Sequence, residues 1–264
     1  MRKIIITGGN EGIGFHMVTQ FLKDGNKVAV LDWKLDNLSL LKYEYNENLE
    51  LFECDIRDAQ AVKQSVNDAC QIFDGIDYAI HNACKHLFTR FMDTTDDDYE
   101  DVFNVNYYGG VNLTRAVLPI MEKQSSGRVI FTCSSSSVTG YLFVYAYASS
   151  KGALEALAKC LNIEYYYKNI SFHILHPPLT GTRAINTLPV PDKHKTDPKV
   201  VGTGLAKHIH KKKFIICHSF LQYLLIRMYY AFPLIFGLLN ANLIVKNSGH
   251  INENDLIRYS SSDD

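Results

Sequence analysis

The stretch that decides the fold is Lys3-Ile4-Ile5-Ile6-Thr7-Gly8-Gly9-Asn10-Glu11-Gly12-Ile13-Gly14, and a helical pattern over residues 15–23 follows it directly. A β-branched run, a glycine-rich turn and a helix, in this order, are typical of the first unit of a nucleotide-binding sheet. Glycines have no Cβ, so the backbone can approach a pyrophosphate closely, and the free N–H groups at the helix start face the anion. We therefore expect a dinucleotide to contact this turn through Gly8, Asn10, Glu11, Gly12, Ile13 and Gly14.

The second apolar segment, residues 27–31, ends at Asp32. A carboxylate at this point accepts hydrogen bonds from the adenosine ribose and repels the 2′-phosphate of NADP. Glu11 adds a second negative charge, whereas Lys34 is the one nearby feature that favours NADP. The sequence therefore predicts NAD in preference to NADP as the cofactor.

Strand-like apolar runs alternate with helical patterns along the chain. This alternation is typical of α/β proteins in which helices cover both faces of a parallel sheet. We predict a single domain with a doubly wound parallel sheet. The predicted strands lie near residues 3–7, 27–32, 49–54, 76–81, 127–133 and 170–176, with a seventh candidate at 214–217, and the long helices lie near 99–122 and 146–168.

Tyr147 and Lys151 stand one helical turn apart, and Ser134 precedes them in a run of serines. The phenol and the ammonium therefore share one helix face, where we expect the cation to lower the tyrosine pKa from its usual value near 10. Such a tyrosine can exchange a proton with a substrate oxygen near neutral pH. Two alternatives stay open, because Ser136 could replace Ser134 and Tyr145 competes with Tyr147, although Tyr145 lacks a lysine four residues on.

With these motifs the chain resembles the short-chain dehydrogenase/reductase family from about residue 3 to residue 183. The resemblance implies a Rossmann fold. The family's acidic position beside the adenine ring is similar to Asp55, which Ile56 follows, and its Asn-Asn-Ala-Gly motif is similar to His81-Asn82-Ala83-Cys84, which differs at two of four positions. The segment that touches the nicotinamide amide resembles Pro177-Pro178-Leu179-Thr180-Gly181-Thr182, with a proline where glycine is usual. The resemblance thus implies further cofactor contacts from Asp55, Ile56, Asn82, Ala83, Tyr147, Lys151, Pro177 and Thr182.

The family's four catalytic positions are all filled in this sequence, by Asn106, Ser134, Tyr147 and Lys151. The resemblance implies that Tyr147 exchanges the proton and that Lys151 also holds the ribose of the nicotinamide. Ser134 would polarise the substrate carbonyl. Asn106 would bind a water that links Lys151 to solvent, with a helix-kink role as its alternative.

Residues 214–245 form an apolar and aromatic segment directly after Lys211-Lys212-Lys213. Polar residues and Pro233 interrupt it, so we do not expect a single membrane-spanning helix. Two short helices hinged at Pro233 fit better. They could cover the substrate cleft, form a subunit interface or an ordinary core helix pair, or contact a bilayer surface as a peripheral membrane site. The ending is also similar to family members that reduce lipid-like ketones or fatty aldehydes.

Composition agrees with one domain, because the chain has 264 residues, 47% of them hydrophobic, and a net charge of -1, which gives no sign of a nucleic-acid partner. The six cysteines and ten histidines show no metal-ligand spacing. The scattered cysteines predict reduced thiols, as in a cytoplasmic protein, and we expect no signal peptide. We predict a catalytic domain over residues 1–213, an apolar arm of the same domain over 214–250 and a polar tail over 251–264. The loop 183–199, with three prolines, is expected to cover the substrate site.

The predicted function is an NAD(P)-dependent oxidoreductase that transfers a hydride between nicotinamide and a secondary alcohol, ketone or aldehyde. We expect an apolar or lipid-like small-molecule substrate and a homodimer or homotetramer. Two alternatives stay open: a non-catalytic dinucleotide-binding sensor or scaffold, which the same fold supports, and a protein of the membrane surface.

Overall fold

The computed structural model describes residues 1–185, 188 and 190–247, so the predicted polar tail 251–264 lies outside the described residues. Within them, seven parallel strands form one sheet in the order β3-β2-β1-β4-β5-β6-β7. The strand order reverses between β1 and β4, which is where nucleotides bind in doubly wound sheets. The strands are β1 (Lys3–Thr7), β2 (Lys27–Asp32), β3 (Leu49–Glu53), β4 (Tyr78–His81), β5 (Gly127–Thr132), β6 (Ile170–Leu175) and β7 (Ile215–Ile216). The predicted doubly wound α/β fold is confirmed.

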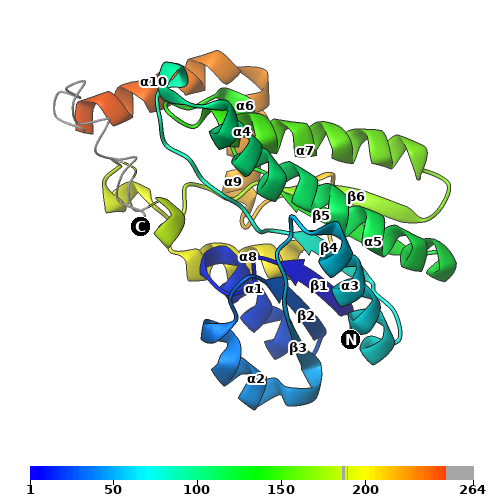
Figure 1. Cartoon of the computed structure of the whole chain (residues 1–264). Coiled ribbons are helices and arrows are strands. Elements are labelled where there is room, and N and C mark those ends of the chain that lie inside the picture. Colours follow the sequence, from blue (N-terminus) through cyan, green and yellow to red (C-terminus); the bar gives the residue numbers. More distant parts are fainter. Residues whose placement is uncertain (186–187, 189, 248–264) are drawn as a thin grey trace.

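Helices cover both faces of this sheet (Figure 1). One hydrophobic core lies between the sheet and the helices that carry Val66, Val117 and Leu154, and the other lies under Phe21 and Leu205. Apolar contacts on both faces explain why the central strands β1 and β2 are nearly continuous apolar runs. The helices are α1 (Gly12–Lys23), α2 (Ser39–Tyr45), α3 (Ala59–Phe73), α4 (Asp96–Phe103), α5 (Gly109–Gln124), α6 (Ser136–Thr139), α7 (Tyr145–Glu164), α8 (Pro198–His208), α9 (Phe220–Ala231) and α10 (Pro233–Asn247).

The predicted long helix over about 99–122 lies within a helical segment that is slightly longer and is not one uniform α-helix. The chain instead forms α4, one π-helical turn over Asn104–Tyr108, and α5. Thr95 sets the start of α4, because its hydroxyl accepts a hydrogen bond from the backbone N–H of Asp98, whose carboxylate accepts from Thr95 in return. The predicted helix over 146–168 is shorter, since α7 ends at Glu164.

The apolar segment after β7 forms α9 and α10, which we call the C-terminal arm. The two helices meet at Pro233 and are bent by 109° relative to each other. No single helix among the described residues is long and apolar enough to cross a membrane, and only this bent pair reaches that length and composition together. Two helices hinged at Pro233 were the structure that the sequence predicted.

Candidate active site

The glycine-rich turn packs directly against the segment that follows β4. Gly8 has a φ of 66°, and a Cβ there would lie 2.6 Å from the Cα of Ala83. A Cβ on Gly14 would lie 1.9 Å from the carbonyl oxygen of Gly8, and Asn82 Nδ2 donates to that same oxygen at 2.8 Å. Only glycine fits at these two positions, so the turn forms a tight cradle at the start of α1.

The predicted cofactor contacts gather at the carboxyl edge of the sheet, where ligands bind in such folds. Thr182 lies over the glycine-rich turn, since a Cβ on Gly12 would be 3.0 Å from its Cγ2. Asp32 ends β2, Asp55 and Ile56 follow β3, Asn82 and Ala83 follow β4, and Pro177 lies just after β6.

Asp32 is held against the turn by backbone hydrogen bonds. Its carboxylate accepts from the N–H of Asn10 at 2.9 Å and from that of Lys34 at 3.3 Å. Burial raises the pKa of Asp32, while these N–H groups act in the opposite direction. The Lys34 ammonium lies 4.9 Å from the ring centroid of Trp33.

Sequence reasoning missed a cation beside the turn, because Arg183 lies outside the glycine motif. Its guanidinium is 3.6 Å from the Glu11 carboxylate. Asp55 also has a partner that was not predicted. Arg57 binds its carboxylate at 2.7 Å, and this hydrogen bond holds the pKa of Asp55 below its usual range. Arg57 stands two residues after Asp55, whereas the fold brings Arg183 to Glu11 from a distant part of the sequence.

Tyr147 and Lys151 both point into the protein from α7. Lys151 is fully buried, and its Nζ has no hydrogen-bond partner among the described residues. Burial raises the pKa of Tyr147, so the expectation of a pKa below the usual value was wrong. Desolvation of the phenolate is the largest cause and the charge of Cys84 adds to it, while Lys151 Nζ lies 5.7 Å from the ring centroid.

Ser134 is the serine beside the tyrosine, and its hydrogen bond acts to lower the pKa of Tyr147. Ser136 instead donates to Ser134 Oγ, from its N–H at 3.2 Å and from its hydroxyl at 2.9 Å. The competing Tyr145 packs its ring edge-on against Phe91, with centroids 5.5 Å apart. The geometry therefore favours Ser134 and Tyr147 over the alternatives that the sequence left open.

Asn106 lies buried in the π-helical turn, and its side chain fastens that turn to the segment after β4. Its Nδ2 donates to the carbonyl of Lys85 at 3.0 Å and to Ser150 Oγ at 2.9 Å, while its Oδ1 accepts from the Lys85 N–H at 2.7 Å. The helix-kink alternative thus matches its position. The amide oxygen Oδ1 has two lone pairs, and the Lys85 N–H occupies one of them, so the other could accept a hydrogen bond from the expected water.

The family model for short-chain dehydrogenases matches residues 2–190 of the chain. The chain belongs to the short-chain dehydrogenase family. Oxidoreductase UcpA of Salmonella typhimurium is 30% identical over 212 residues, which cover 78% of this chain and 79% of that protein. A fatty acyl-CoA reductase of Acinetobacter baylyi is 28% identical over 69% of this chain and 63% of its own length. The 3-ketodihydrosphingosine reductase of Bos taurus is also 28% identical, over 68% of this chain and 56% of its own length.

Solved structures confirm the fold of this short-chain dehydrogenase. A short-chain dehydrogenase from Streptomyces avermitilis superposes with a TM-score of 0.78 at 20% identity, covering 88% of this chain and 93% of that one. A 3-ketoacyl-(acyl-carrier-protein) reductase from Brucella melitensis in complex with NADH gives 0.69 at 20% identity, covering 77% and 87%. ElxO with NADP bound gives 0.72 at 22% identity, covering 83% and 95%.

The histidine that replaces the first asparagine of the family motif has a structural role. His81 is fully buried, and burial lowers its pKa to about 3, so the ring is neutral. Thr7 Oγ1 accepts from the N–H groups of Asn82 and Ala83, so its hydroxyl donates to His81 Nδ1 at 3.0 Å. His81 Nε2 then donates to the Asn106 carbonyl at 2.9 Å. The sequence showed that His81 replaces an asparagine of the motif, but it could not show the hydrogen bonds of His81 with Thr7 and Asn106.

Cys84 and His86 are site residues that sequence reasoning did not assign. The Cys84 thiol lies 3.4 Å from His86 Nε2, and the His86 ring stacks on Tyr147. Desolvation raises the pKa of Cys84, but the charge and hydrogen bond of His86, together with the charge of Lys151, outweigh it and lower the pKa to about 7. A thiolate is therefore accessible beside the proposed catalytic tyrosine near neutral pH.

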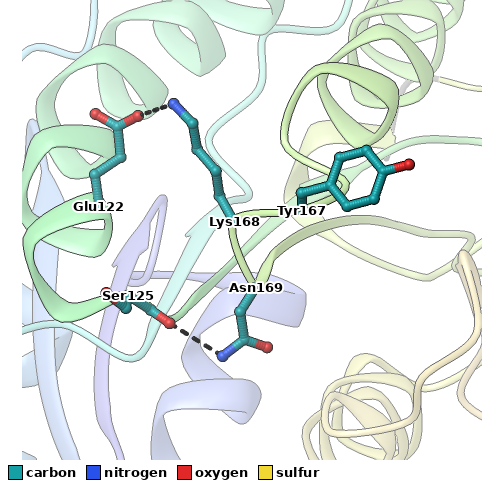
Figure 2. A pocket seen from close by; sticks show the side chains of 5 residues that line it. All are labelled: Glu122, Ser125, Tyr167, Lys168 and Asn169. Atoms are coloured by element: carbon teal, nitrogen blue, oxygen red, sulfur yellow. Dashed lines mark hydrogen bonds and ion pairs between the residues drawn. The ribbon is translucent and has the colours of Figure 1, made fainter.

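A surface hollow lies away from this site, at the end of the sheet where β5 and β6 begin. Figure 2 shows that its walls come from the end of α5 and the turn after α7. Lys168 pairs with Glu122 at 2.6 Å, and Asn169 donates to the Ser125 carbonyl at 3.0 Å, so its polar groups serve to join two elements. The lining residues are Glu122, Ser125, Tyr167, Lys168 and Asn169.

Proposed function

We propose that this short-chain dehydrogenase transfers a hydride between NAD and an alcohol, ketone or aldehyde carbon of an apolar, lipid-like substrate. The observation that carries the proposal is the buried Tyr147 and Lys151 pair with Ser134 beside the phenol. A scaffold or sensor would not require a buried ammonium next to a buried phenol.

The residues present fit a dinucleotide. The glycine cradle accepts the pyrophosphate because side chains there would collide with backbone. The Lys151 ammonium has no hydrogen-bond acceptor among the residues that the structure describes, and the hydroxyls of a nicotinamide ribose are acceptors of the required kind. When bound, the nicotinamide supplies or accepts the hydride.

The protein side of the reaction is proton transfer and charge stabilisation. Because burial raises the pKa of Tyr147, its phenol is protonated at neutral pH and is ready to donate to a developing alkoxide. Ser134 donates a hydrogen bond to the same oxygen in the reductive direction. Lys151 stabilises the phenolate that remains and lowers the cost of the transfer.

NAD is proposed over NADP because Asp32 offers a buried carboxylate at the end of β2. It accepts two backbone N–H bonds, which favour its charged form against burial. Arg183 and Lys34 are the cations that could oppose this preference, and the Arg183 guanidinium is paired with the Glu11 carboxylate at 3.6 Å. The similar solved structures include one complex with NADH and one with NADP, so they do not distinguish between the two cofactors. The proposed preference for NAD rests on the local charges.

The apolar surroundings of Tyr147 support a lipid-like substrate. Phe88 and Tyr141 pack both on the cluster that contains Tyr147 and on the cluster that joins the loop after β6 to Ile244 of the arm. That loop was expected to cover the substrate site, and its described residues Ile185, Leu188 and Val190 are buried there. Two relatives are named for a fatty acyl-CoA and for 3-ketodihydrosphingosine, both lipid-derived.

We further propose a homo-oligomer in the cytoplasm. All six cysteines are free thiols, as expected in a reducing compartment. Exposed Tyr108, Ile163 and Tyr166 lie near α5 and α7 and offer apolar surface for subunit contact.

A substrate screen tests the proposal. NADH oxidation is measured with ketones and aldehydes of rising chain length, with NADPH in parallel and with Tyr147→Phe as the control. The expected result is activity that rises with chain length and is absent in the variant, since each enclosed CH₂ contributes about 0.8 kcal/mol. Activity only on short polar substrates would overturn the lipid assignment. NADH binding without turnover on any carbonyl would favour the sensor alternative.

A further inference from the structure

The outward face of the C-terminal arm is the largest concentration of exposed apolar side chains in the described residues. Of 21 exposed large hydrophobic residues, nine lie between positions 220 and 239. They repeat at helical spacing, so each helix presents one continuous apolar face. They are Phe220, Leu221, Leu224 and Met228 of α9, Phe232 at the bend, and Leu234, Ile235, Leu238 and Leu239 of α10.

The inward face of the arm is fixed to the catalytic elements. On α9, Tyr230 donates to Glu155 of α7 at 2.7 Å and contacts His176 after β6 at 3.2 Å. On α10, Gly237 lies so close to α6 that a Cβ there would be 2.3 Å from the Thr139 carbonyl oxygen. Figure 1 shows α10 beside α6 at the outside of the molecule. The apolar face is therefore held in one orientation by the fold.

The charged side chains of the segment that carries this face all have the same sign. From Pro198 to Asn247 the sequence contains seven lysines and arginines and no aspartate or glutamate. Lys211, Lys212 and Lys213 are exposed, as is Arg227 on the outward side of α9. Lys213 lies 4.3 Å from the ring centroid of Tyr223, which places the end of this basic cluster directly on α9.

These features match one occupant, a bilayer surface with anionic headgroups. Interfacial helices combine an apolar face with lysine and arginine near it, and anionic lipid attracts those cations. The 109° bend opposes a straight span, so both helices would lie along the surface and insert only their outward side chains. We propose that the C-terminal arm docks this protein on anionic membranes through the outward faces of α9 and α10.

A second copy of the chain is a less suitable occupant of the same face. A symmetric contact through the arms would bring the two basic clusters toward each other without any acidic side chain from this segment to neutralise them. The proposal does not depend on the proposed reaction. Turnover of a short, water-soluble carbonyl in the absence of vesicles reports on the reaction separately.

The experiment is co-sedimentation of the full chain with vesicles of phosphatidylcholine alone and of phosphatidylcholine with phosphatidylglycerol. We expect at least tenfold stronger binding to the anionic vesicles, and loss of that difference in high salt. Leu234→Ser with Leu238→Ser should weaken binding at least tenfold. The matched control, Leu40→Ser with Tyr43→Ser, removes two similarly exposed apolar side chains from α2 and should bind as the wild type does.

A third variant, Lys211→Gln with Lys212→Gln, should reduce the preference for anionic vesicles and leave the weaker binding to neutral vesicles unchanged. Thermal unfolding without vesicles confirms that each variant is folded. Wild-type protein that stays in the supernatant with both vesicles, or equal binding by the arm variant, overturns the proposal. A wild-type dimer that becomes monomeric in the arm variant, without vesicle binding, would identify a second copy as the occupant instead.

Discussion

The imidazole of His86 stacks on the phenol of Tyr147, with ring centroids 4.1 Å apart and an interplanar angle of 25°. The same imidazole reaches the Cys84 thiol at 3.4 Å. The charge and hydrogen bond of His86 act to lower the pKa of Cys84, and the negative charge of the Cys84 thiolate in turn acts to raise the pKa of Tyr147. The proton chemistry of this site therefore includes two side chains that the family tetrad does not contain.

Tyr147→Phe should reduce turnover at least about a hundredfold, because it removes the proton that a positioned acid supplies. NADH binding, measured by fluorescence titration, should stay within a few-fold, since the substitution removes one hydroxyl and keeps the ring. Lys151→Met should impair both turnover and NADH binding, because it removes the buried ammonium. Retention of more than about a tenth of the wild-type rate by Tyr147→Phe would exclude the proposed acid.

Cys84 should react with iodoacetamide at a rate that rises with pH and reaches half of its maximum near pH 7. The thiolate is the reactive form, and His86 lowers the pKa of Cys84 to about 7. In His86→Ala the rate at pH 7 should fall roughly tenfold, because an ordinary thiol has a pKa of about 8.5. Mass spectrometry locates the label, and Cys160, the other exposed cysteine, is the internal control. A rate at Cys84 that is indifferent to His86→Ala would contradict this assignment.

Asp32→Ala should narrow the preference for NADH over NADPH. A like-charge contact with the 2′-phosphate costs on the order of 1 to 3 kcal/mol, so the wild type should favour NADH at least about tenfold in kcat/KM. Arg183→Ala, which leaves Asp32 in place, should not reduce that ratio. Equal use of both cofactors by the wild type would show that Arg183 or Lys34 outweighs the carboxylate.

Gly237→Ala and Gly152→Ala form a matched pair in two helices. At Gly237 the new Cβ would meet the Thr139 carbonyl at 2.3 Å, and we expect a loss of about 1 to 3 kcal/mol or detachment of α10. At Gly152 nothing lies within 4 Å, so alanine should stabilise α7 by about 0.5 to 1 kcal/mol. Thermal unfolding measures both, and opposite signs are expected. An unchanged melting temperature in Gly237→Ala would mean that α10 does not pack closely on α6.

The strands could be predicted well because most of them are rich in apolar residues and bounded by turn residues. The predicted strands 3–7 and 27–32 match β1 and β2, and the others overlap their strands with ends that differ by one or two residues. The helix before β5 could not be predicted correctly, since the π-helical turn depends on hydrogen bonds from Asn106 to Lys85, which is distant in sequence. Local periodicity contains no signal for such a contact.

In the site, too, features that depend on nearby residues could be predicted, and features that depend on distant segments could not. Spacing alone placed Tyr147 and Lys151 on one helix face, and the structure has them there. The pKa of Tyr147 depends on burial by other segments, so its direction could not follow from the four-residue spacing. The partner of Glu11 is Arg183, which is distant in sequence, so this pair could not follow from a local pattern.

The hydrogen bond between Tyr230 and Glu155 joins positions 75 residues apart in the sequence. At a synthesis rate of about 5 to 20 residues per second, the helix with Glu155 leaves the ribosome roughly 4 to 15 seconds before Tyr230 follows. During that interval the nascent chain can form its sheet, but the apolar surface around α6 and α7 stays uncovered and resembles what chaperones bind. We therefore expect the catalytic centre to mature only after the arm has emerged.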